Sequence, residues 1–306
     1  MNNQDKVAVC SRSFSRHPIL RREILRLYRH VTFNEQGVNL HGQSLVDFIR
    51  GHNKAITALE KIDEIVLSQL PELEVIAKYG VGLDMIDLGA MQRYGKRLGW
   101  TPGVNKRSAA ELALAFAIIT LRQVIAGNRE ILQGSWRQLT GGQLTGRTVG
   151  IIGCGHIGQE FIRLLRPFNC PILVYDIKEY KTFYHKFNIR AVKIEELLCK
   201  SDVVSLHVPL DKATRNLLTG KQLSLMKKTA VLINVARGGL VDECDLKEAL
   251  RSGGLSAAAF DVFAQEPPQD KELLNLPNFL ATPHIGGSAE EAILEMGRAA
   301  IRNLED

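Results

Sequence analysis

The chain has 306 residues, of which 45% are hydrophobic and 24% are charged, and its formal net charge at pH 7 is +6. A chain of this length forms about two domains, and the ordinary composition excludes a disordered, collagen-like or membrane-spanning protein. The basic residues are spread along the chain without a long run. We therefore expect a small anionic partner rather than nucleic acid.

The cysteines and the N-terminus indicate a cytoplasmic protein. Five cysteines are scattered without a C-x-x-C pair or a metal-binding spacing, which predicts reduced thiols and no metal site. The polar first residues lead directly into the strand-like residues 7–10, so no signal segment is expected. The longest uncharged apolar run, residues 112–121, is too short to cross a bilayer and suits a buried helix.

Strand-like and helix-like segments alternate through the first third of the chain. The predicted strands are residues 6–10, 54–58 and 75–77, with weaker candidates at 31–33 and 97–100. The predicted helices are residues 18–28, with a proline in the first turn, and 63–69. This alternation is typical of βαβ units with a mostly parallel sheet.

A long helix is predicted over residues 105–132, where Ser108 and Glu111 have the spacing of a capping box. Short apolar runs follow at 148–152, 172–175, 203–206, 230–233, 257–260 and 279–282. Runs that are apolar on both faces suit strands covered by helices on each side, so we expect six strands in a doubly wound sheet. An amphipathic helix over 288–304 is expected to return to the first domain.

A glycine fingerprint, GCGHIG at residues 153–158, follows the predicted strand 148–152 and opens a helix expected over 159–165. Gly153 suits a tight turn, Gly155 lets the backbone approach a pyrophosphate, and Gly158 allows close packing of helix on strand. Asp176 ends the next strand, where a carboxylate can accept both ribose hydroxyls and repel a 2′-phosphate. The arrangement predicts NAD binding; a plain glycine turn between core elements is the alternative.

Beyond the fingerprint, the sequence resembles the D-isomer-specific 2-hydroxyacid dehydrogenases, especially the phosphoglycerate-dehydrogenase-like and glyoxylate-reductase-like members. The resemblance depends on KYGVGLD (78–84), TPGVN (101–105), the fingerprint, HVPL (207–210), NVARGG (234–239), DVFAQEP (261–267) and TPHIGG (282–287). It implies an α/β protein of two doubly wound parallel-sheet domains with a cleft between them. Residues 1–100 and 287–306 would form the smaller, flavodoxin-like substrate domain, and residues 101–286 the Rossmann NAD-binding domain.

The resemblance assigns catalysis to Arg237, Glu266 and His284. Arg237 follows a predicted strand at the sheet edge where α/β sites lie, and its guanidinium can grip a carboxylate; a surface arginine that caps Asp242 is the alternative. His284 suits proton transfer near neutral pH. Glu266 would orient the His284 ring and stabilise its protonated form, although the sequence alone would favour a solvated loop carboxylate.

Contacts with the substrate and the cofactor are also implied by the resemblance. The substrate carboxylate would be bound by Arg237 and by the backbone amides of Tyr79, Gly80, Val81 and Gly82. Contacts with NAD are expected at Gly153, Gly155, His156, Ile157, Gly158, Asp176, His207, Val208, Pro209, Val235, Ala236, Arg237, Asp261, His284, Gly286 and Gly287. His156 and His207 compete with His284 as the catalytic base, but their positions favour contact with the cofactor.

We expect hydride transfer between NAD and C2 of a D-2-hydroxy or 2-keto acid, with a phosphoglycerate-dehydrogenase-like substrate. Residues 56–60 lack the arginine that such enzymes place near the substrate phosphate, which Lys61 or Lys78 could replace. The alternatives are a glyoxylate, hydroxypyruvate or D-lactate-type reductase, a phosphite- or formate-type dehydrogenase, and a non-catalytic, corepressor-like NAD-binding protein. The family resemblance also implies a homodimer that pairs through the cofactor domain.

Overall fold

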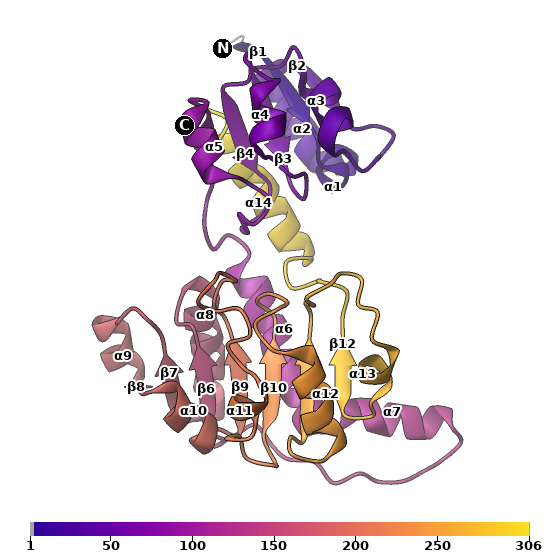
Figure 1. Cartoon of the computed structure of the whole chain (residues 1–306), viewed down its shortest axis with the longest axis vertical. Helices are drawn as coiled ribbons and strands as arrows, with labels where there is room; N and C mark the ends of the chain where they lie inside the picture. The colour runs from indigo at the N-terminus through magenta and orange to yellow at the C-terminus, as the bar shows by residue number, and fades with distance from the viewer. Residues whose placement is uncertain (1–2, 306) are drawn as a thin grey trace. The chain divides into compact units, whose positions relative to one another are not determined.

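The computed structural model describes residues 3–305, which divide into two compact units (Figure 1). Unit 1 comprises Met1–Asn105 and Gly287–Asp306, and unit 2 comprises Lys106–Gly286. Residues 1, 2 and 306, at the ends of the predicted first domain, lie outside the described residues. Residues 101–105, which the sequence grouped with the second domain, pack with unit 1, where Asn303 Nδ2 donates to Thr101 Oγ1 at 3.0 Å.

Unit 1 is built on a five-stranded parallel sheet in the order β2-β1-β3-β4-β5, which is the flavodoxin-type strand order. Its strands are β1 (Asn3–Val9), β2 (Tyr28–Phe33), β3 (Lys54–Thr57), β4 (Val75–Lys78) and β5 (Arg97–Gly99). Alternate residues of β1 enter different cores: Val7 and Val9 lie in one buried cluster and Ala8 in the other. The sheet is therefore covered on both faces, and its strands are parallel, as the βα alternation predicted.

Helices cover the two faces of this sheet. One face is covered by α1 (Arg12–Arg16), α2 (Pro18–Leu27) and α14 (Glu290–Arg302), and the other by α3 (Gly42–Ile49), α4 (Glu64–Ser68) and α5 (Leu88–Arg93). The C-terminal helix packs closely against α2, because an added Cβ at Gly297 would lie 2.2 Å from Leu20 Cδ1. The last helix thus belongs to the same core as the first strands.

Unit 2 contains a seven-stranded parallel sheet in the order β12-β11-β10-β9-β6-β7-β8. Its strands are β6 (Val149–Ile152), β7 (Ile172–Tyr175), β8 (Arg190–Ala191), β9 (Val203–Leu206), β10 (Val231–Asn234), β11 (Ala257–Phe260) and β12 (Phe279–Ala281). The sequence predicted six strands in this sheet, and the strand that it missed is β8. This two-residue edge strand is exposed and polar at Arg190, so it has no apolar run to reveal it.

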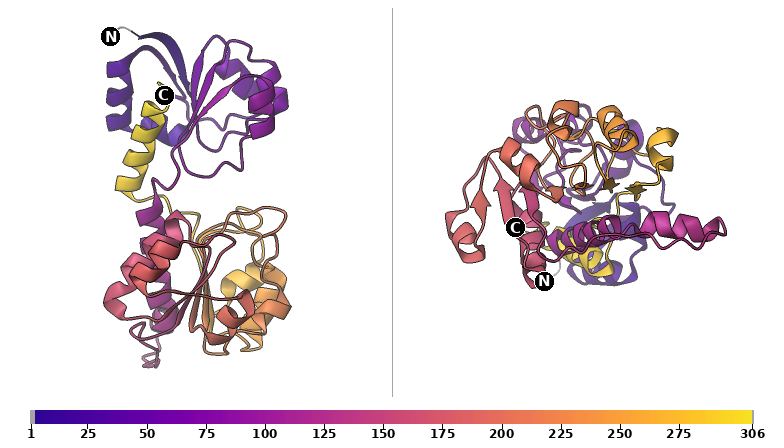
Figure 2. Two further views of the ribbon diagram at one scale, coloured as in Figure 1. Left: turned by 90° about the vertical axis from the view of Figure 1, so that its left-hand side faces the viewer. Right: turned by 90° about the horizontal axis from the view of Figure 1, so that it is seen from below.

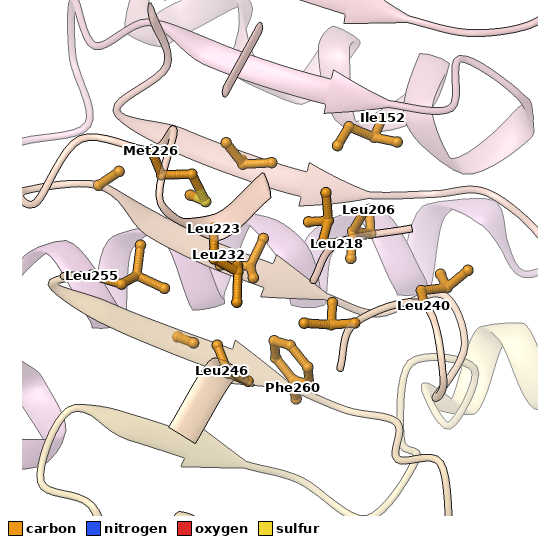
Figure 3. Packing of buried hydrophobic residues seen from close by; sticks show 14 of the residues in the cluster. Ile152, Leu206, Leu218, Leu223, Met226, Leu232, Leu240, Leu246, Leu255 and Phe260 are labelled. Carbon is orange, nitrogen blue, oxygen red and sulfur yellow. The ribbon is translucent and has the colours of Figure 1, made fainter. Parts of the chain in front are cut away.

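Helices lie on both faces of the second sheet (Figure 2), and a buried cluster lines each face. One lies under α6 (Lys106–Leu121), α8 (His156–Leu165) and α9 (Lys181–Phe187), with a 3-10 turn at Arg166–Phe168. The other lies under α10 (Ile194–Lys200), α11 (Gly220–Leu223), α12 (Glu243–Arg251) and α13 (Lys271–Asn275). Figure 3 shows this second cluster, in which Leu246 of α12 lies beside Phe260 of β11.

The predicted helix over 105–132 is broken into α6 and α7 (Val124–Leu132), which meet at a bend of 62°. Gln123 has a left-handed backbone (φ 53°), and its side chain donates to Thr140 O at 2.7 Å. Gly142 N–H donates to the carbonyl of Leu121 at 2.8 Å, so the returning chain takes an acceptor that a continuing helix would use. Contacts with a distant segment therefore end a helix whose apolar pattern continues.

The proposed capping box at Ser108 is also wrong. The helix begins at Lys106, and the Ser108 hydroxyl, inside its first turn, donates to Gly286 O at 2.7 Å. Within residues 3–305, no single helix is long and apolar enough to cross a membrane, and α6 and α7 meet that criterion only when taken together as a bent pair.

Candidate active site

The glycine fingerprint forms a tight turn between β6 and α8. Gly153 has φ 98°, and an added Cβ there would lie 2.7 Å from the carbonyl carbon of His207. A Cβ on Gly158 would lie 2.1 Å from Gly153 O, so the helix can approach the turn only with glycine at this position. At Gly155 nothing lies within 4 Å of an added Cβ. The turn therefore leaves open space at Gly155, directly beside the N-terminus of α8.

α8 begins at His156, earlier than the predicted start at residue 159, and Gly155 is its N-cap. The first amides of the helix therefore lie beside the open space, where their dipoles attract an anion. Asp176, which follows β7, accepts Cys154 N–H at 2.6 Å and Lys178 N–H at 2.8 Å. A bare helix terminus with a carboxylate near the same turn fits the pyrophosphate and ribose of a dinucleotide.

The two competing histidines lie in different surroundings. His207 directly follows β9, its Nε2 lies 3.0 Å from Ser205 Oγ, and burial lowers its pKa from 6.5 to about 3. Its Nδ1 is buried without a hydrogen-bond partner. His207 is therefore a neutral imidazole at neutral pH. His156 is exposed in the first turn of α8, beside the fingerprint.

The Arg237 turn, residues 235–239, follows β10 and is shaped by a side chain that the sequence analysis missed. Asn234 is 1% exposed; its Oδ1 accepts Ala236 N–H at 3.1 Å and its Nδ2 donates to Arg237 O at 2.9 Å. Gly238 lies against the next turn, because an added Cβ would be 1.9 Å from the carbonyl of Phe263. Asn234 thus orients the backbone that carries the guanidinium.

The alternative interpretation of Arg237, as a surface arginine that caps Asp242, pairs it with a carboxylate that has a structural role of its own. Asp242 is the N-cap of α12, where its Oδ1 accepts the amides of Cys244 and Asp245, both at 3.0 Å. The Arg237 Nη1 donates to Ala236 O at 2.7 Å. The guanidinium is half-buried beside its own turn.

The His284 turn, residues 283–286, follows β12 and is bonded to a buried carboxylate at the end of β11. Asp261, 1% exposed, accepts Ile285 N–H at 2.7 Å and the Thr282 hydroxyl at 2.5 Å on one oxygen, and Gly286 N–H at 2.7 Å on the other. Its backbone carbonyl accepts His284 N–H at 2.9 Å. These bonds stabilise the left-handed backbone of His284 (φ 54°). Asp261 therefore positions His284, a role that the sequence analysis did not identify.

Glu266 and His284, separated by eighteen residues, are joined by a hydrogen bond. His284 Nδ1 lies 2.9 Å from Glu266 Oε2, and Glu266 Oε1 accepts Phe263 N–H at 3.1 Å. The two side chains are 48% and 39% exposed, so the pair is open to a ligand. With Nδ1 bonded to a carboxylate, Nε2 is the ring nitrogen available to exchange a proton.

The other predicted cofactor residues lie at or beside the carboxyl ends of the strands of unit 2. They are Ile157, Val208, Pro209, Val235, Ala236 and Gly286, whereas Gly287 belongs to unit 1. Residues 79–82 follow β4 at the carboxyl edge of the sheet of unit 1. Trp100 Nε1 donates to Val81 O at 3.1 Å, and Gly80 has φ 132°. The proposed substrate loop and the catalytic trio thus belong to different units.

All five cysteines are free thiols. Across residues 3–305, no group of three or more His, Cys, Asp or Glu side chains is arranged to bind a metal ion.

Comparison with known proteins places these features in one family. The family model of the NAD-binding domain of the D-isomer specific 2-hydroxyacid dehydrogenases matches residues 114–286. Glyoxylate reductase of Pyrococcus horikoshii is 37% identical over 254 residues, 80% of this chain and 76% of the relative. D-3-phosphoglycerate dehydrogenase of Methanocaldococcus jannaschii is 35% identical over 277 residues, 89% of this chain and 53% of the relative. The chain thus spans about half the length of that second relative.

Solved structures resemble the whole chain. A glyoxylate reductase from Paecilomyes thermophila has a TM-score of 0.87 and 27% identity, and the match covers 99% of this chain and 94% of that one. The D-lactate dehydrogenase of Lactobacillus jensenii, solved with NAD+, has a TM-score of 0.79 and 26% identity, with 97% and 94% covered. The prediction of two parallel-sheet domains, one with the Rossmann fold, is confirmed.

Two glycine substitutions test the cofactor-binding and the packing roles of the fingerprint separately. We expect Gly155→Ala to fold normally and to weaken NADH binding, because its Cβ enters the open space beside α8. Gly158→Ala is expected to unfold at lower urea, because its Cβ meets a backbone carbonyl 2.1 Å away. NADH fluorescence titration and urea unfolding of both variants measure this. Unchanged NADH affinity in folded Gly155→Ala would contradict the cofactor position.

His207 is expected to make unit 2 sensitive to acid. The unfolded chain protonates this histidine below pH 6.5, whereas the folded chain keeps it neutral to about pH 3, so stability falls as the pH decreases through this window. The loss between neutral pH and pH 5 should be on the order of 2 kcal/mol. Urea unfolding of His207→Asn should show a smaller pH dependence than wild type. His156→Asn, which replaces an exposed histidine, is the control. If His207→Asn loses stability with decreasing pH as steeply as wild type, His207 is not the source of the acid sensitivity.

Proposed function

The chain belongs to the D-isomer-specific 2-hydroxyacid dehydrogenases, and from this we propose that Arg237, Glu266 and His284 carry out its hydride-transfer reaction on a 2-hydroxy or 2-keto acid. As a member of this family it is an NAD-dependent oxidoreductase. The observation that supports the proposal most directly is the 2.9 Å contact between His284 Nδ1 and Glu266 Oε2, beside the Arg237 turn.

Bound NAD supplies the nicotinamide carbon that accepts or donates the hydride. The protein transfers the proton. His284 Nε2 accepts it from the substrate hydroxyl during oxidation and donates it to the carbonyl oxygen during reduction. Glu266, bonded to Nδ1, orients the ring so that Nε2 faces the reacting oxygen of the substrate. The Arg237 guanidinium binds the substrate carboxylate in a bidentate geometry and polarises the neighbouring carbonyl.

Two further groups complete the proposed site. The backbone amides of residues 79–82 would bind the other side of the substrate carboxylate. Asp176 would accept the ribose hydroxyls of the cofactor and so favour NAD over NADP. The open space at Gly155 supports a pyrophosphate beside the first turn of α8.

The substrate is proposed to be a short 2-hydroxy acid of the phosphoglycerate type, as in the relative from Methanocaldococcus jannaschii. One observation favours a second candidate, the smaller glyoxylate or hydroxypyruvate. The two lysines that could replace the missing arginine have internal partners: Lys61 Nζ lies 3.2 Å from Asp63 Oδ2, and the Lys78 ammonium donates to Ala58 O. Neither lysine therefore has its whole hydrogen-bonding capacity available for a substrate phosphate.

A substrate panel separates these candidates. We expect NADH oxidation with glyoxylate, hydroxypyruvate or 3-phosphohydroxypyruvate, measured by absorbance with NADPH in parallel. D-Lactate, phosphite and formate with NAD test the remaining dehydrogenase types. Tight NADH binding without turnover on any of these acids would instead support a non-catalytic, corepressor-like protein.

His284→Ala tests the proposed base. We expect kcat to fall roughly 10²- to 10⁴-fold on the best substrate of the panel, because proton transfer loses its positioned group. NADH affinity should change by less than about threefold, since the fingerprint is untouched. His185→Ala, an exposed histidine of α9, is the control and should keep wild-type turnover. Near-normal turnover of His284→Ala would exclude His284 as the base.

The protein is further proposed to act as a cytoplasmic homodimer that pairs through α7 and the segment after it. Ile131, Leu132 and Trp136 are 59%, 77% and 85% exposed, an apolar surface that a partner copy would cover. The free thiols suit the reducing cytoplasm. Light scattering should give twice the chain mass of 34.0 kDa, and Leu132→Asp should lower it. A wild-type monomer at assay concentration would refute the dimer.

A further inference from the structure

The turn that carries Glu266, residues 262–266, is anchored on its inner side by an aromatic cluster. The Phe263 ring lies 6.5 Å from Phe260 and 6.3 Å from Phe279, measured between ring centroids, and Phe263 is 6% exposed. Its amide donates to Glu266 Oε1, as described above. From Ala264 onward the turn is exposed, so the aromatic packing holds only its beginning.

A second anchor comes from α12. Glu243 is the first residue of this helix, and its Oε1 accepts the Ala264 amide at 2.7 Å. The helix is a firm support, because its buried Leu246 and Leu250 lie in the core of unit 2 and Asp242 caps its N-terminus. Glu243 thus connects the rigid helix to the exposed half of the turn.

The surroundings of Glu243 disfavour a charged carboxylate. This argues that its hydrogen bond with the Ala264 amide is not incidental. Burial raises its pKa, and the negative charges of Asp270, Asp242 and Glu266 raise it further, while the Ala264 amide lowers it. Lys247 pairs with Asp270 at 2.8 Å and offsets part of this negative charge. The hydrogen bond to Ala264 is the favourable contact made at this position.

The contacts form a continuous path from the helix to the proposed base. Glu243 binds the Ala264 amide, the neighbouring Phe263 amide binds Glu266 Oε1, and Glu266 Oε2 binds His284 Nδ1. The Arg237 turn contacts the same backbone, since Gly238 lies directly against Phe263. A shift of residues 263–264 would therefore move Glu266 relative to both other members of the trio.

We propose that Glu243 is a positioning residue for hydride transfer: by accepting the Ala264 amide it fixes the Glu266 carboxylate and, through it, the His284 ring. Glu243 reaches neither substrate nor cofactor in this role. The inference rests on the proposed function, in which Glu266 and His284 serve proton transfer.

Three substitutions of Glu243 test the hydrogen bond. Glu243→Ala removes the acceptor, and Glu243→Asp keeps the charge but shortens the side chain, so both should lower kcat of keto-acid reduction roughly 10- to 100-fold. Glu243→Gln keeps an oxygen that can accept the Ala264 amide and should recover most of the lost rate. Substrate KM and NADH affinity should stay within about threefold in all three. Glu248→Ala, exposed on the same helix, is the matched control.

A double-mutant cycle separates positioning from general stability. If Glu243 acts through Glu266, Glu243→Ala should have little further effect on kcat in the Glu266→Gln background, because the group that it positions is already disabled. An equal loss in both backgrounds would overturn the inference, as would wild-type kcat in Glu243→Asp. Urea unfolding confirms that each variant is folded under assay conditions.

The two proposals fail in different ways. Normal turnover by His284→Ala contradicts the proposed function, whatever Glu243 does. Loss of turnover in His284→Ala together with additive effects of Glu243 and Glu266 contradicts only the positioning role.

Discussion

In-register pairing of three parallel strands is the constraint on which the candidate site depends. Asn234, the last residue of β10, pairs with Phe260 of β11, which pairs with Ala281 of β12. The strands therefore end side by side, and the turns that follow them carry Arg237, Glu266 and His284. Because carboxyl ends of parallel strands share one edge, turns far apart in the chain come to the same edge of the sheet.

Polar side chains at this edge are bonded mainly to backbone amides of neighbouring turns. Asn234 bonds to the Arg237 turn, Asp261 to the His284 turn, and Glu243 to the turn of Glu266. Buried polar groups need such partners, since an unpaired one costs about 1–3 kcal/mol. The hydrogen bonds that satisfy these polar groups also fix the turns. They thereby position the imidazole and the guanidinium that the turns carry.

Local order was predictable where its cause is local. The strands β7, β9 and β11 lie at the predicted residues, because short, largely apolar runs are buried when they form strands covered on both faces. The edge strand β8 was missed because its residues are exposed. The break at Gln123 was missed because the acceptor at Leu121 is taken by Gly142, a partner from outside the helix. Prediction thus failed where a distant segment supplied the deciding contact.

The amino-acid sequence by itself determined the βα alternation, the glycine turn and the family, since these depend on neighbouring residues: apolar period, permitted φ angles and ordered motifs. Only the tertiary structure decided which amide each carboxylate accepts. Asp261 sits in a recognisable motif, yet its bonds to the His284 turn span more than twenty residues, as does the bond from Glu243 to Ala264. The physical reason is that a hydrogen bond requires its two atoms to lie within about 3 Å. For residues far apart in the chain, the packing of strands and helices sets that distance.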